Sequence, residues 1–476
     1  MNIDILSLSS FSIAGLLYAV LQITVTLHIL LKKDDVKSSI GWIGLVWLAP
    51  LLGSIVYVLF GINRIRRKAL SLRNKGPNLL TITGKTTEEI EKRIPPPFLQ
   101  LFRLGYKVHP QHFALGNTVL PFVNGDSAYP EMCRLISNAQ KEVLLQSYIF
   151  NNDSAGKLFL DALRKAVQNG AKVKVLVDGV GLNYSKPTIV RELKKIKGIE
   201  IGIFLPSKKP VTLPFVNLRN HRKILIVDGK YAFFGGMNIA EGNLVSRKPK
   251  EPIIDITFKV EGAVVDQMSR VFEEDWIFAG KKHFIPASCH NTSGTDGHLP
   301  ARIIPDGPDS DYGKIEMLIL GALSCAQKNI QIVTPYFLPE NNILSALEVA
   351  AMRGVNVDII LPQKSNIFGM DRAMRANFRS LLSKGVKIYR TSPPFDHSKI
   401  MIVDGSWLLV GSANWDVRSF KLNFECNMEC IDVPLARKVE EIIKQKKDIA
   451  KQETLENTPF FQTLLDKAFK LLTPYY

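Results

Sequence analysis

A pattern of eight residues, His-x-Lys-x-x-x-x-Asp, occurs twice in this chain of 476 residues, and each copy is followed by Gly-x-x-Asn at the same distance. The first copy spans residues 221–228 and leads to Asn238; the second spans residues 397–404 and leads to Asn414. One copy could arise by chance, but two copies with one downstream spacing indicate an internal repeat. We therefore predict two similar domains whose motifs meet in one site of pseudo-twofold symmetry.

Each motif continues into a short, apolar, β-branched run that ends in Asp-Gly, which is typical of a strand followed by a turn. Side chains alternate along a strand, so we expect His221 and Lys223 on one face and Asp228 on the other. The second copy has the same parity. The motif aspartates are thus expected behind the site, in a structural or supporting role.

Together the two motifs would gather two imidazoles, two ammonium groups and two amides around one point. Fixed ammonium and amide donors suit a phosphate that is held without a metal ion. One imidazole can attack phosphorus while the other moves a proton, because His titrates near neutral pH. The candidate catalytic residues are His221, Lys223, Asp228, His397, Lys399 and Asp404, with Asn238 and Asn414 as candidate phosphate-binding residues. The duplication disfavours the alternative, two unrelated strands with exposed ends.

Internal similarity extends beyond the motifs. Residues 138–145 parallel residues 325–332, and each segment leads to an aromatic strand end, a helix and a second strand. This order predicts an α/β fold of two similar α/β/α domains. We place the first domain at residues 116–290 and the second at 298–476, with a Ser/Thr/Gly/Asp-rich seam at 288–297.

The N-terminal residues 1–62 are predicted to form a transmembrane hairpin. Residues 5–31 and 39–62 are apolar runs long enough to cross a bilayer, and Pro50 is expected to kink the second. A basic linker, residues 63–115, follows and carries four positive charges within residues 64–68. Two spans would make this a multi-pass protein. The positive-inside rule then favours a cytoplasmic location for its catalytic region. Buried helices of a soluble domain are the alternative.

The net charge and composition limit the classes of molecule that this protein is expected to bind. A net charge of +17 attracts polyanions, and the hydrophobic N-terminus favours an anionic phospholipid membrane over nucleic acid. No phosphate-binding Gly loop, dinucleotide-binding motif or dense Asp cluster is present in the sequence, so we expect neither a cofactor nor a metal ion. Residues 460–472 form an amphipathic helical pattern, for which packing on the domain is favoured over insertion at a membrane interface.

The paired motifs, with Gly235-Gly236-Met237-Asn238 and Gly411-Ser412-Ala413-Asn414, resemble those of the phospholipase D superfamily. The surrounding sequence is similar to bacterial cardiolipin synthases, notably at Thr334–Pro339 and in Asn414-x-Asp416-x-Arg418-Ser419. The segment Pro-Ile-Ile-Asp-Ile around Asp255 departs from the Trp-Arg-Asp-Thr expected there. The resemblance covers nearly the whole chain and implies a phosphatidyltransferase of the bacterial plasma membrane.

The resemblance also implies a mechanism. His221 would attack the phosphodiester of one phosphatidylglycerol, and His397 would protonate the departing glycerol. A second phosphatidylglycerol would then accept the phosphatidyl group from the phosphohistidine to give cardiolipin. Glu425 lies 28 residues after His397, where related enzymes carry a carboxylate that holds the His ring, and Asp255 occupies the comparable place after His221.

Two other functions remain open at this point. A phospholipase D-type hydrolase or a membrane-tethered nuclease would share every candidate residue and use water as the acceptor. A non-catalytic lipid-binding scaffold would not need two His residues. Phosphatidylethanolamine also remains an alternative donor.

Overall fold

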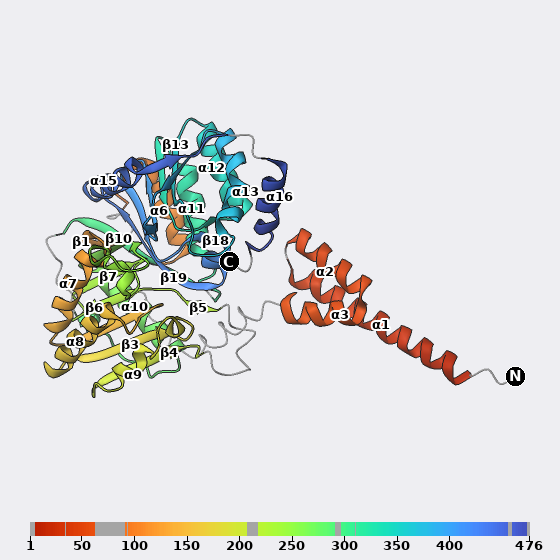
Figure 1. Ribbon diagram of the computed structural model, residues 1–476, viewed down its shortest axis with the longest axis horizontal. Helices are drawn as coiled ribbons and strands as arrows, with labels where there is room; N and C mark the ends of the chain where they lie inside the picture. The colour runs from red at the N-terminus through yellow and green to blue at the C-terminus, as the bar shows by residue number, and fades with distance from the viewer. Residues whose placement is uncertain are drawn as a thin grey trace. The chain divides into compact units, whose positions relative to one another are not determined.

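The computed structural model describes residues 5–33, 35–61, 91–92, 94–206, 218–290, 297–309, 311–455 and 459–473. The chain forms two units, Met1–Lys68 and Ala69–Tyr476, which are taken separately below (Figure 1). Residues 63–68, most of the predicted linker and the centre of the predicted seam lie outside the described residues.

The N-terminal unit contains helices α1 (Ile5–Lys32), α2 (Val36–Leu48) and α3 (Pro50–Val56), followed by a π-helical turn, Tyr57–Gly61. Within the described residues, one helix is long and apolar enough to cross a membrane, and its span is Gly15–Lys32. The predicted first span is therefore present as a helix. The predicted second span, residues 39–62, is not one helix, because it divides into two short helices.

The division of the second apolar segment is centred on Pro50. Proline disfavours the α conformation in the residue before it, and Ala49 has φ −140° and ψ 78°. A Cβ on Gly53 would lie 2.5 Å from the Leu45 carbonyl oxygen, so α3 folds back along α2 instead of continuing its axis. The expected kink is thus a full break. The 13 residues of α2 extend about 20 Å, which is shorter than a bilayer core.

Helices α1, α2 and α3 pack around a small core of Val25, Ile29, Val46 and Tyr57. A polar contact supports this packing, since Trp47 Nε1 donates to Thr26 Oγ1 at 3.1 Å. The outer faces carry exposed large apolar side chains, among them Leu17, Val20, Ile23, Leu27, Leu30, Ile40, Leu48, Leu51, Leu52 and Ile55. Apolar side chains on all outer faces are typical of a helical unit surrounded by lipid.

The second unit is built on one continuous sheet. Its first half has the strand order β1 (Ala114–Val123), β9 (Ile256–Glu261), β7 (Tyr231–Gly235), β6 (Ile224–Val227), β2 (Glu142–Ser147), β3 (Lys172–Asp178) and β4 (Ile199–Phe204). Its second half has the strand order β10 (Leu299–Asp306), β19 (Asn423–Ile431), β17 (Trp407–Gly411), β16 (Ile400–Val403), β11 (Asn329–Val333), β13 (Asn356–Pro362), β14 (Lys387–Thr391) and β20 (Ala450–Gln452).

The two halves are repeats of one topology. In each, the order runs from a first strand through an antiparallel meander to three parallel strands, and β20 is an addition at the end of the second half. The halves join where β1 pairs antiparallel with β10, with Ala114 opposite Ala301. The predicted pseudo-twofold symmetry is therefore present in the sheet. Both halves belong to one compact unit, so the boundaries at residues 116–290 and 298–476 stay a prediction.

Helices cover both faces of the sheet (Figure 1). In the first half these are α7 (Asn124–Ser137), α8 (Ser154–Gln168), α9 (Ile189–Leu193) and α10 (Val264–Phe278). In the second half they are α11 (Lys314–Cys325), α12 (Asn341–Met352), α13 (Met370–Ser383), α14 (Val417–Lys421), α15 (Val433–Asp448) and α16 (Phe460–Lys470), and α6 (Leu99–Val108) packs on α11. The predicted α/β/α layering is confirmed.

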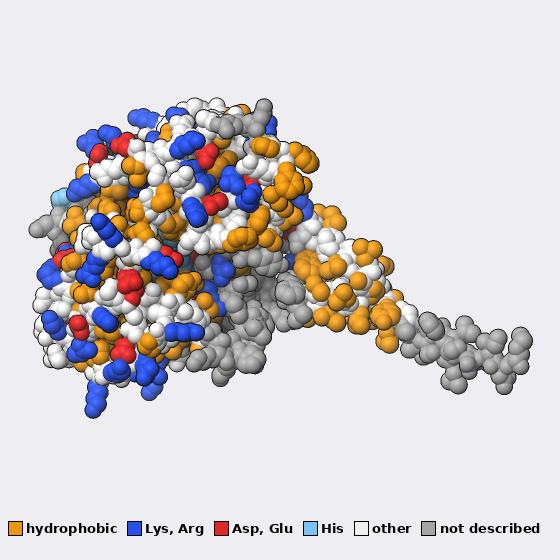
Figure 2. Space-filling model, viewed as in Figure 1, with side chains coloured by type: hydrophobic (Ala, Val, Ile, Leu, Met, Phe, Trp, Pro, Cys, Tyr) orange, Lys and Arg blue, Asp and Glu red, His pale blue; other side chains and the backbone are white. Residues whose placement is uncertain are grey.

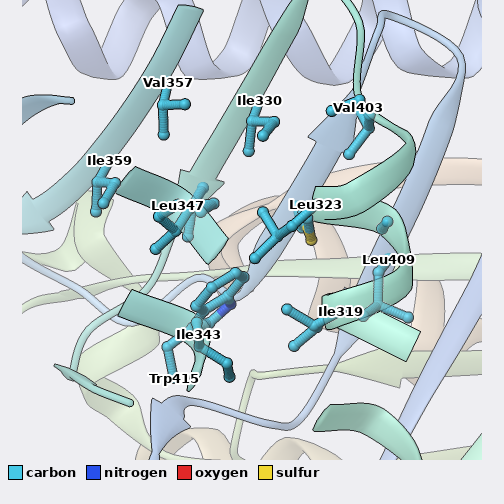
Figure 3. Close-up of a cluster of buried hydrophobic side chains, with 14 of the residues drawn as sticks. Ile319, Leu323, Ile330, Ile343, Leu347, Val357, Ile359, Val403, Leu409 and Trp415 are labelled. Atoms are coloured by element: carbon cyan, nitrogen blue, oxygen red, sulfur yellow. The ribbon is translucent and has the colours of Figure 1, made fainter. Parts of the chain in front are cut away.

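Each half has its own apolar core between sheet and helices. In the second half, Ile330, Val357 and Ile359 from the strands meet Leu323 and Leu347 from α11 and α12 (Figure 3). Strand β13 is buried on both faces after its first residue and is largely apolar, whereas β11 alternates buried Ile330 and Ile332 with half-buried Asn329 and Gln331. The first half repeats the arrangement with β2, β3, α7 and α8.

The aspartates of the two motifs stabilise the turns that precede the equivalent strands β2 and β11. Asp228 and Asp404 have positive φ values of 53° and 50°. The carboxylate of Asp228 accepts from the N–H groups of Gln140, Lys141 and Glu142 at 2.7–3.1 Å, and Asp404 accepts from the equivalent residues Gln327, Lys328 and Asn329 at 2.7–2.9 Å. These contacts agree with the predicted supporting role of the two aspartates, but both residues lie in left-handed turns just after β6 and β16, so strand parity does not by itself place their side chains.

We predict that Asp228→Ala and Asp404→Ala each lower the free energy of unfolding by about 2–3 kcal/mol, because three N–H groups lose their acceptor. Asn should cost less, since it retains an acceptor and tolerates the left-handed conformation. Thermal unfolding of the full-length protein in detergent measures this effect. An Asp228→Ala variant that melts with the wild-type protein would contradict a structural role.

Candidate active site

A cavity of about 710 Å³ lies between the two halves of the second unit. Its wall includes His221, Asn238 and Asp255 from the first half and His397 and Asn414 from the second. The structure therefore brings together the imidazoles and amides that the sequence predicts. Asp228 and Asp404, which the sequence analysis counts with the catalytic set, do not line the cavity and hold turns instead.

Short strands exchanged between the halves position the two imidazoles. Strand β5 (Arg219–Asn220) pairs parallel with β19 of the other half, and the His221 N–H donates to the Phe424 carbonyl at 2.9 Å. Likewise, β15 (Phe395–Asp396) pairs parallel with β8 (Ile253–Ile254), and the His397 N–H donates to the Ile254 carbonyl at 2.7 Å. Each motif is thus anchored to the backbone of the opposite half.

The carboxylates cross between the halves in the same way. His221 Nδ1 lies 3.0 Å from Glu425 Oε1, and His397 Nδ1 lies 2.8 Å from Asp255 Oδ2. The sequence analysis predicted that Glu425 and Asp255 orient the rings and located each by its distance from the His of its own half. In the structure, each carboxylate contacts the His of the opposite half. The register of the exchanged strands explains the result: Asn220 lies opposite Phe424, so the next residues, His221 and Glu425, become neighbours.

Both carboxylates are buried and held by further donors. Glu425 accepts from Ser412 Oγ at 2.5 Å and from Asn423 Nδ2 at 3.1 Å. Asp255 accepts from the Ile256 N–H at 2.7 Å. A carboxylate on Nδ1 favours the tautomer in which Nδ1 carries the proton and Nε2 has a free lone pair. Both rings are therefore prepared to react through Nε2.

The two motif lysines are buried next to the imidazoles. Lys223 Nζ donates to the His221 carbonyl at 2.6 Å, and Lys399 Nζ donates to the His397 carbonyl at 2.5 Å. Burial lowers the pKa of Lys223 to about 7 and that of Lys399 to about 8, although Glu425 and Asp255 oppose this shift. An anion in the cavity would favour the charged form of both ammonium groups.

Burial also changes the protonation of the two imidazoles. It lowers the pKa of His221 to about 4 and that of His397 to about 4, and the neighbouring lysines add to this effect. Both rings are therefore neutral at pH 7. Burial tends to raise the pKa of Glu425, but His221 and Lys223 outweigh it, so this carboxyl stays ionised with a lowered pKa. A phosphate entering the cavity would raise the imidazole pKa values.

The two asparagines reach the cavity from equivalent turns. The Oδ1 atom of Asn238 accepts from the Ile149 N–H at 3.1 Å, so the donor end of its amide is directed away from that contact. Asn414 is fixed through its backbone, whose N–H donates to Ser419 Oγ at 3.2 Å. Its buried Oδ1 has no hydrogen-bond partner within the described structure. Both side chains can therefore contact a bound phosphodiester.

Several cavity residues were missed by the sequence analysis. The ring of Tyr148 lies 5.0 Å from that of His221, and Tyr336 lies 6.5 Å from His397. Their positions after the repeated strands β2 and β11 were the available signal. Arg219 and Arg418 add positive charge to the wall. Arg418 belongs to the Asn414-x-Asp416-x-Arg418-Ser419 segment that resembles cardiolipin synthases, whereas Arg219 has no repeat partner to mark it. Among the described residues, no group of three or more His, Cys, Asp or Glu side chains could hold a metal ion.

Comparison with known proteins agrees with this geometry. The family described as "Cardiolipin synthase, PLD-like domain" matches residues 132–276 and 319–447, which correspond to the two halves. A second family, described as "Phospholipase D-nuclease N-terminal", matches residues 20–61 in the N-terminal unit.

Similar proteins align along almost the full chain. Cardiolipin synthase 1 of Bacillus cereus is 30% identical over 489 aligned positions, which cover 98% of this chain and 94% of that protein. A cardiolipin synthase of Clostridium perfringens is 32% identical and covers 90% of this chain and 91% of its own length. The major cardiolipin synthase of Bacillus subtilis is 29% identical with full coverage of both chains.

Among solved structures, the phosphatidylserine synthase of Haemophilus influenzae has a similar fold. Its TM-score is 0.60 at 16% identity, and the match covers 79% of this chain and 99% of that chain. The fold, the paired motifs and the extent of the family match lead to one conclusion. This chain belongs to the cardiolipin synthase family of proteins with phospholipase D-like domains.

Proposed function

We propose that this protein is a cardiolipin synthase, which transfers a phosphatidyl group from one phosphatidylglycerol to another and releases glycerol. The observation that carries the proposal is the pair of carboxylate-bound imidazoles on one cavity, with a buried lysine beside each. One imidazole is needed as nucleophile and one as acid and base, and the lysines offset the charge of the phosphate. The full-length similarity to cardiolipin synthases supports the choice of substrate.

In the first step, Nε2 of His221 forms a bond to phosphorus, and the bond from phosphorus to the glycerol headgroup oxygen breaks. His397, protonated in the presence of the phosphodiester charge, donates its Nε2 proton to the departing glycerol. The product is a phosphatidyl-histidine. Lys223, Lys399, Asn238 and Asn414 bind the phosphoryl oxygens, while Glu425 and Asp255 keep the two rings oriented.

In the second step, the terminal hydroxyl of another phosphatidylglycerol takes the place of the departed glycerol. His397 accepts the hydroxyl proton, the oxygen attacks phosphorus, and the bond from phosphorus to His221 breaks. Two phosphatidylglycerols thus become one cardiolipin and one glycerol. One phosphodiester replaces another, so the exchange needs no nucleotide, and the proposed steps use no cofactor or metal ion.

The protein is proposed to act at the bacterial plasma membrane. Helix α1 has the length and composition of a membrane span, and the exposed apolar faces of α2 and α3 support insertion of the second segment into the same bilayer. The basic residues 64–68 follow this segment and favour a cytoplasmic catalytic unit by the positive-inside rule. In this proposal the protein is multi-pass, and anionic phospholipids are its immediate surroundings.

The first test uses labelled phosphatidylglycerol as the sole lipid substrate. Wild-type protein is expected to form one glycerol per cardiolipin, because one lipid serves as donor and acceptor, and a His221→Ala variant is expected to form neither. Mass spectrometry of the lipids and an enzymatic glycerol assay measure the two products. Phosphatidic acid and glycerol without cardiolipin would identify a hydrolase instead, and equal cardiolipin from both proteins would exclude catalysis by this site.

The second prediction concerns the covalent intermediate. Rapid-quench digestion during turnover should find the phosphatidyl group on His221. Glu425→Gln should slow its formation by about 10²-fold or more, because the amide cannot hold the reactive tautomer and stabilise the charged ring. Glu425→Asp, which keeps the charge, serves as the control. A phosphatidyl group on His397 would reverse the two roles, and an unchanged rate in Glu425→Gln would contradict the crossed pairing.

The third prediction separates charge from stability. Lys223→Ala and Lys399→Ala should each lower turnover by about 10²–10³-fold, the scale of one preorganised electrostatic contact. Lys→Arg should restore little, because the planar guanidinium is larger and differently aimed. The lysine variants should melt closer to the wild-type protein than the Asp→Ala variants do, since each ammonium donates one hydrogen bond where each motif carboxylate accepts from three N–H groups. Side-by-side assay and melting with the two Asp→Ala variants tests this, and early melting of the lysine variants would contradict it.

A further inference from the structure

Helix α16 is attached to the second unit through Asp466 and through Phe469, which packs against the core of the second half. Asp466 is 4% exposed, and its carboxylate accepts from Arg375 at 3.2 Å and from Arg372 at 3.4 Å, both on α13. The sequence analysis favoured packing of this segment on the domain, and that packing is confirmed. The ion pairs and the packing of Phe469 together set which face of α16 turns inward.

The outward face of α16 is apolar, the reverse of a surface helix in a water-soluble domain. Phe460 is 83% exposed, Phe461 is 69% exposed and Leu471 is 79% exposed, and Leu464 and Leu472 are also exposed. Hydrophobic side chains gather at the edge of the unit where α16 lies (Figure 2). We call these five residues together with Phe368 the apolar edge. A contiguous exposed patch of this kind marks an interaction surface.

The apolar edge is continuous with the wall of the active-site cavity. Ile367 and Met370 line the cavity, and Phe368 between them in sequence is 87% exposed. The ring of Phe368 contacts that of Phe469 on α16, with centroids 5.7 Å apart. An apolar path therefore leads from the exposed face of α16 along Phe368 to the cavity rim.

Charge around this edge is positive. Residues 364–379 and 460–470 carry two acidic side chains, Asp371 and Asp466, against six basic ones, Lys364, Arg372, Arg375, Arg379, Lys467 and Lys470. Aromatic and aliphatic side chains bordered by basic residues match the boundary between acyl chains and anionic headgroups. A soluble acidic protein would match the charge but not the apolar rings.

We propose that the apolar edge inserts into an anionic phospholipid bilayer and admits lipid acyl chains to the cavity. This inference rests on the proposed function only for the identity of the lipid that enters. The headgroup phosphate can then reach the imidazoles while its acyl chains stay in contact with Phe368 and the face of α16. Substrate leaves the bilayer without complete exposure of its chains to water.

Insertion is tested directly with a Phe461→Trp variant of the full-length protein in equimolar phosphatidylglycerol and phosphatidylcholine vesicles. Bromine atoms on the acyl chains should quench the added fluorescence, measured as the difference from the wild-type protein. Ile285→Trp is the matched control, because Ile285 is 65% exposed and lies outside the apolar edge. Equal, weak quenching of both variants would overturn the proposal. Blue-shifted emission without quenching would place α16 against protein, either the N-terminal helices or a second copy, and would also overturn it.

The role in lipid entry is tested with Phe461→Asp. Turnover of phosphatidylglycerol in vesicles should fall about 10-fold or more, because a charge at this depth opposes insertion. Turnover of dihexanoyl phosphatidylglycerol, dispersed as monomers, should change less than about twofold, because it needs no bilayer contact. Ile285→Asp should leave both rates unchanged. An equal loss on both substrates would contradict a role in entry. A wild-type protein inactive on both lipids would refute the proposed function, while the quenching result would still decide insertion.

Discussion

The exchange of short strands between the two halves is the interaction on which the site depends. The backbone bonds from His221 to Phe424 and from His397 to Ile254 hold each imidazole on the opposite half. The same pairing brings each ring to its carboxylate, so one structural element sets both position and tautomer. Neither half contains a complete imidazole–carboxylate pair. The continuous sheet through β1 and β10 keeps the halves in the register that this exchange requires.

The four basic side chains of the two motifs are desolvated around one cavity. Burial and mutual proximity lower the pKa values of both lysines and both imidazoles, and nearby carboxylates, chiefly Glu425 and Asp255, oppose this shift. Such an arrangement costs stability, because the nearby carboxylates only partly offset the desolvation of these groups. A bound phosphodiester would add negative charge and raise all four pKa values together. Ligand charge, and not a change of fold, would then bring the acid–base groups to their working protonation states.

Helices near both ends of the chain, α2 and α3 in the first unit and α16 in the second, expose apolar side chains. Pro50 divides the second N-terminal segment, so α2 and α3 fold back on one another beside α1. At the other end, ion pairs to Asp466 turn the apolar face of α16 outward. In both places a polar contact or a backbone constraint leaves apolar side chains exposed that a water-soluble domain would bury. A membrane-bound substrate gives a common physical reason, because lipid can cover apolar faces that the protein leaves open.

Local pattern was sufficient to predict much of this protein. The duplicated motif, the strand–helix–strand order and the parity of His, Lys and Asp predicted a two-repeat α/β fold, a shared cavity and aspartates behind it. Each of these features depends on the spacing between residues that lie close together in the sequence. The break at Pro50 was only partly predicted, because a single proline is compatible with either a kink in one helix or a reversal between two helices.

The crossed pairing of rings and carboxylates was decided by tertiary structure alone. His221 and Glu425 are 204 residues apart, and His397 and Asp255 are 142 residues apart. Because the two halves are alike, pairing within a half and pairing across halves satisfy the same local chemistry. Which one occurs depends on the register of β5 against β19 and of β15 against β8. That register is set by how the two halves pack, and no short-range pattern in the sequence encodes it.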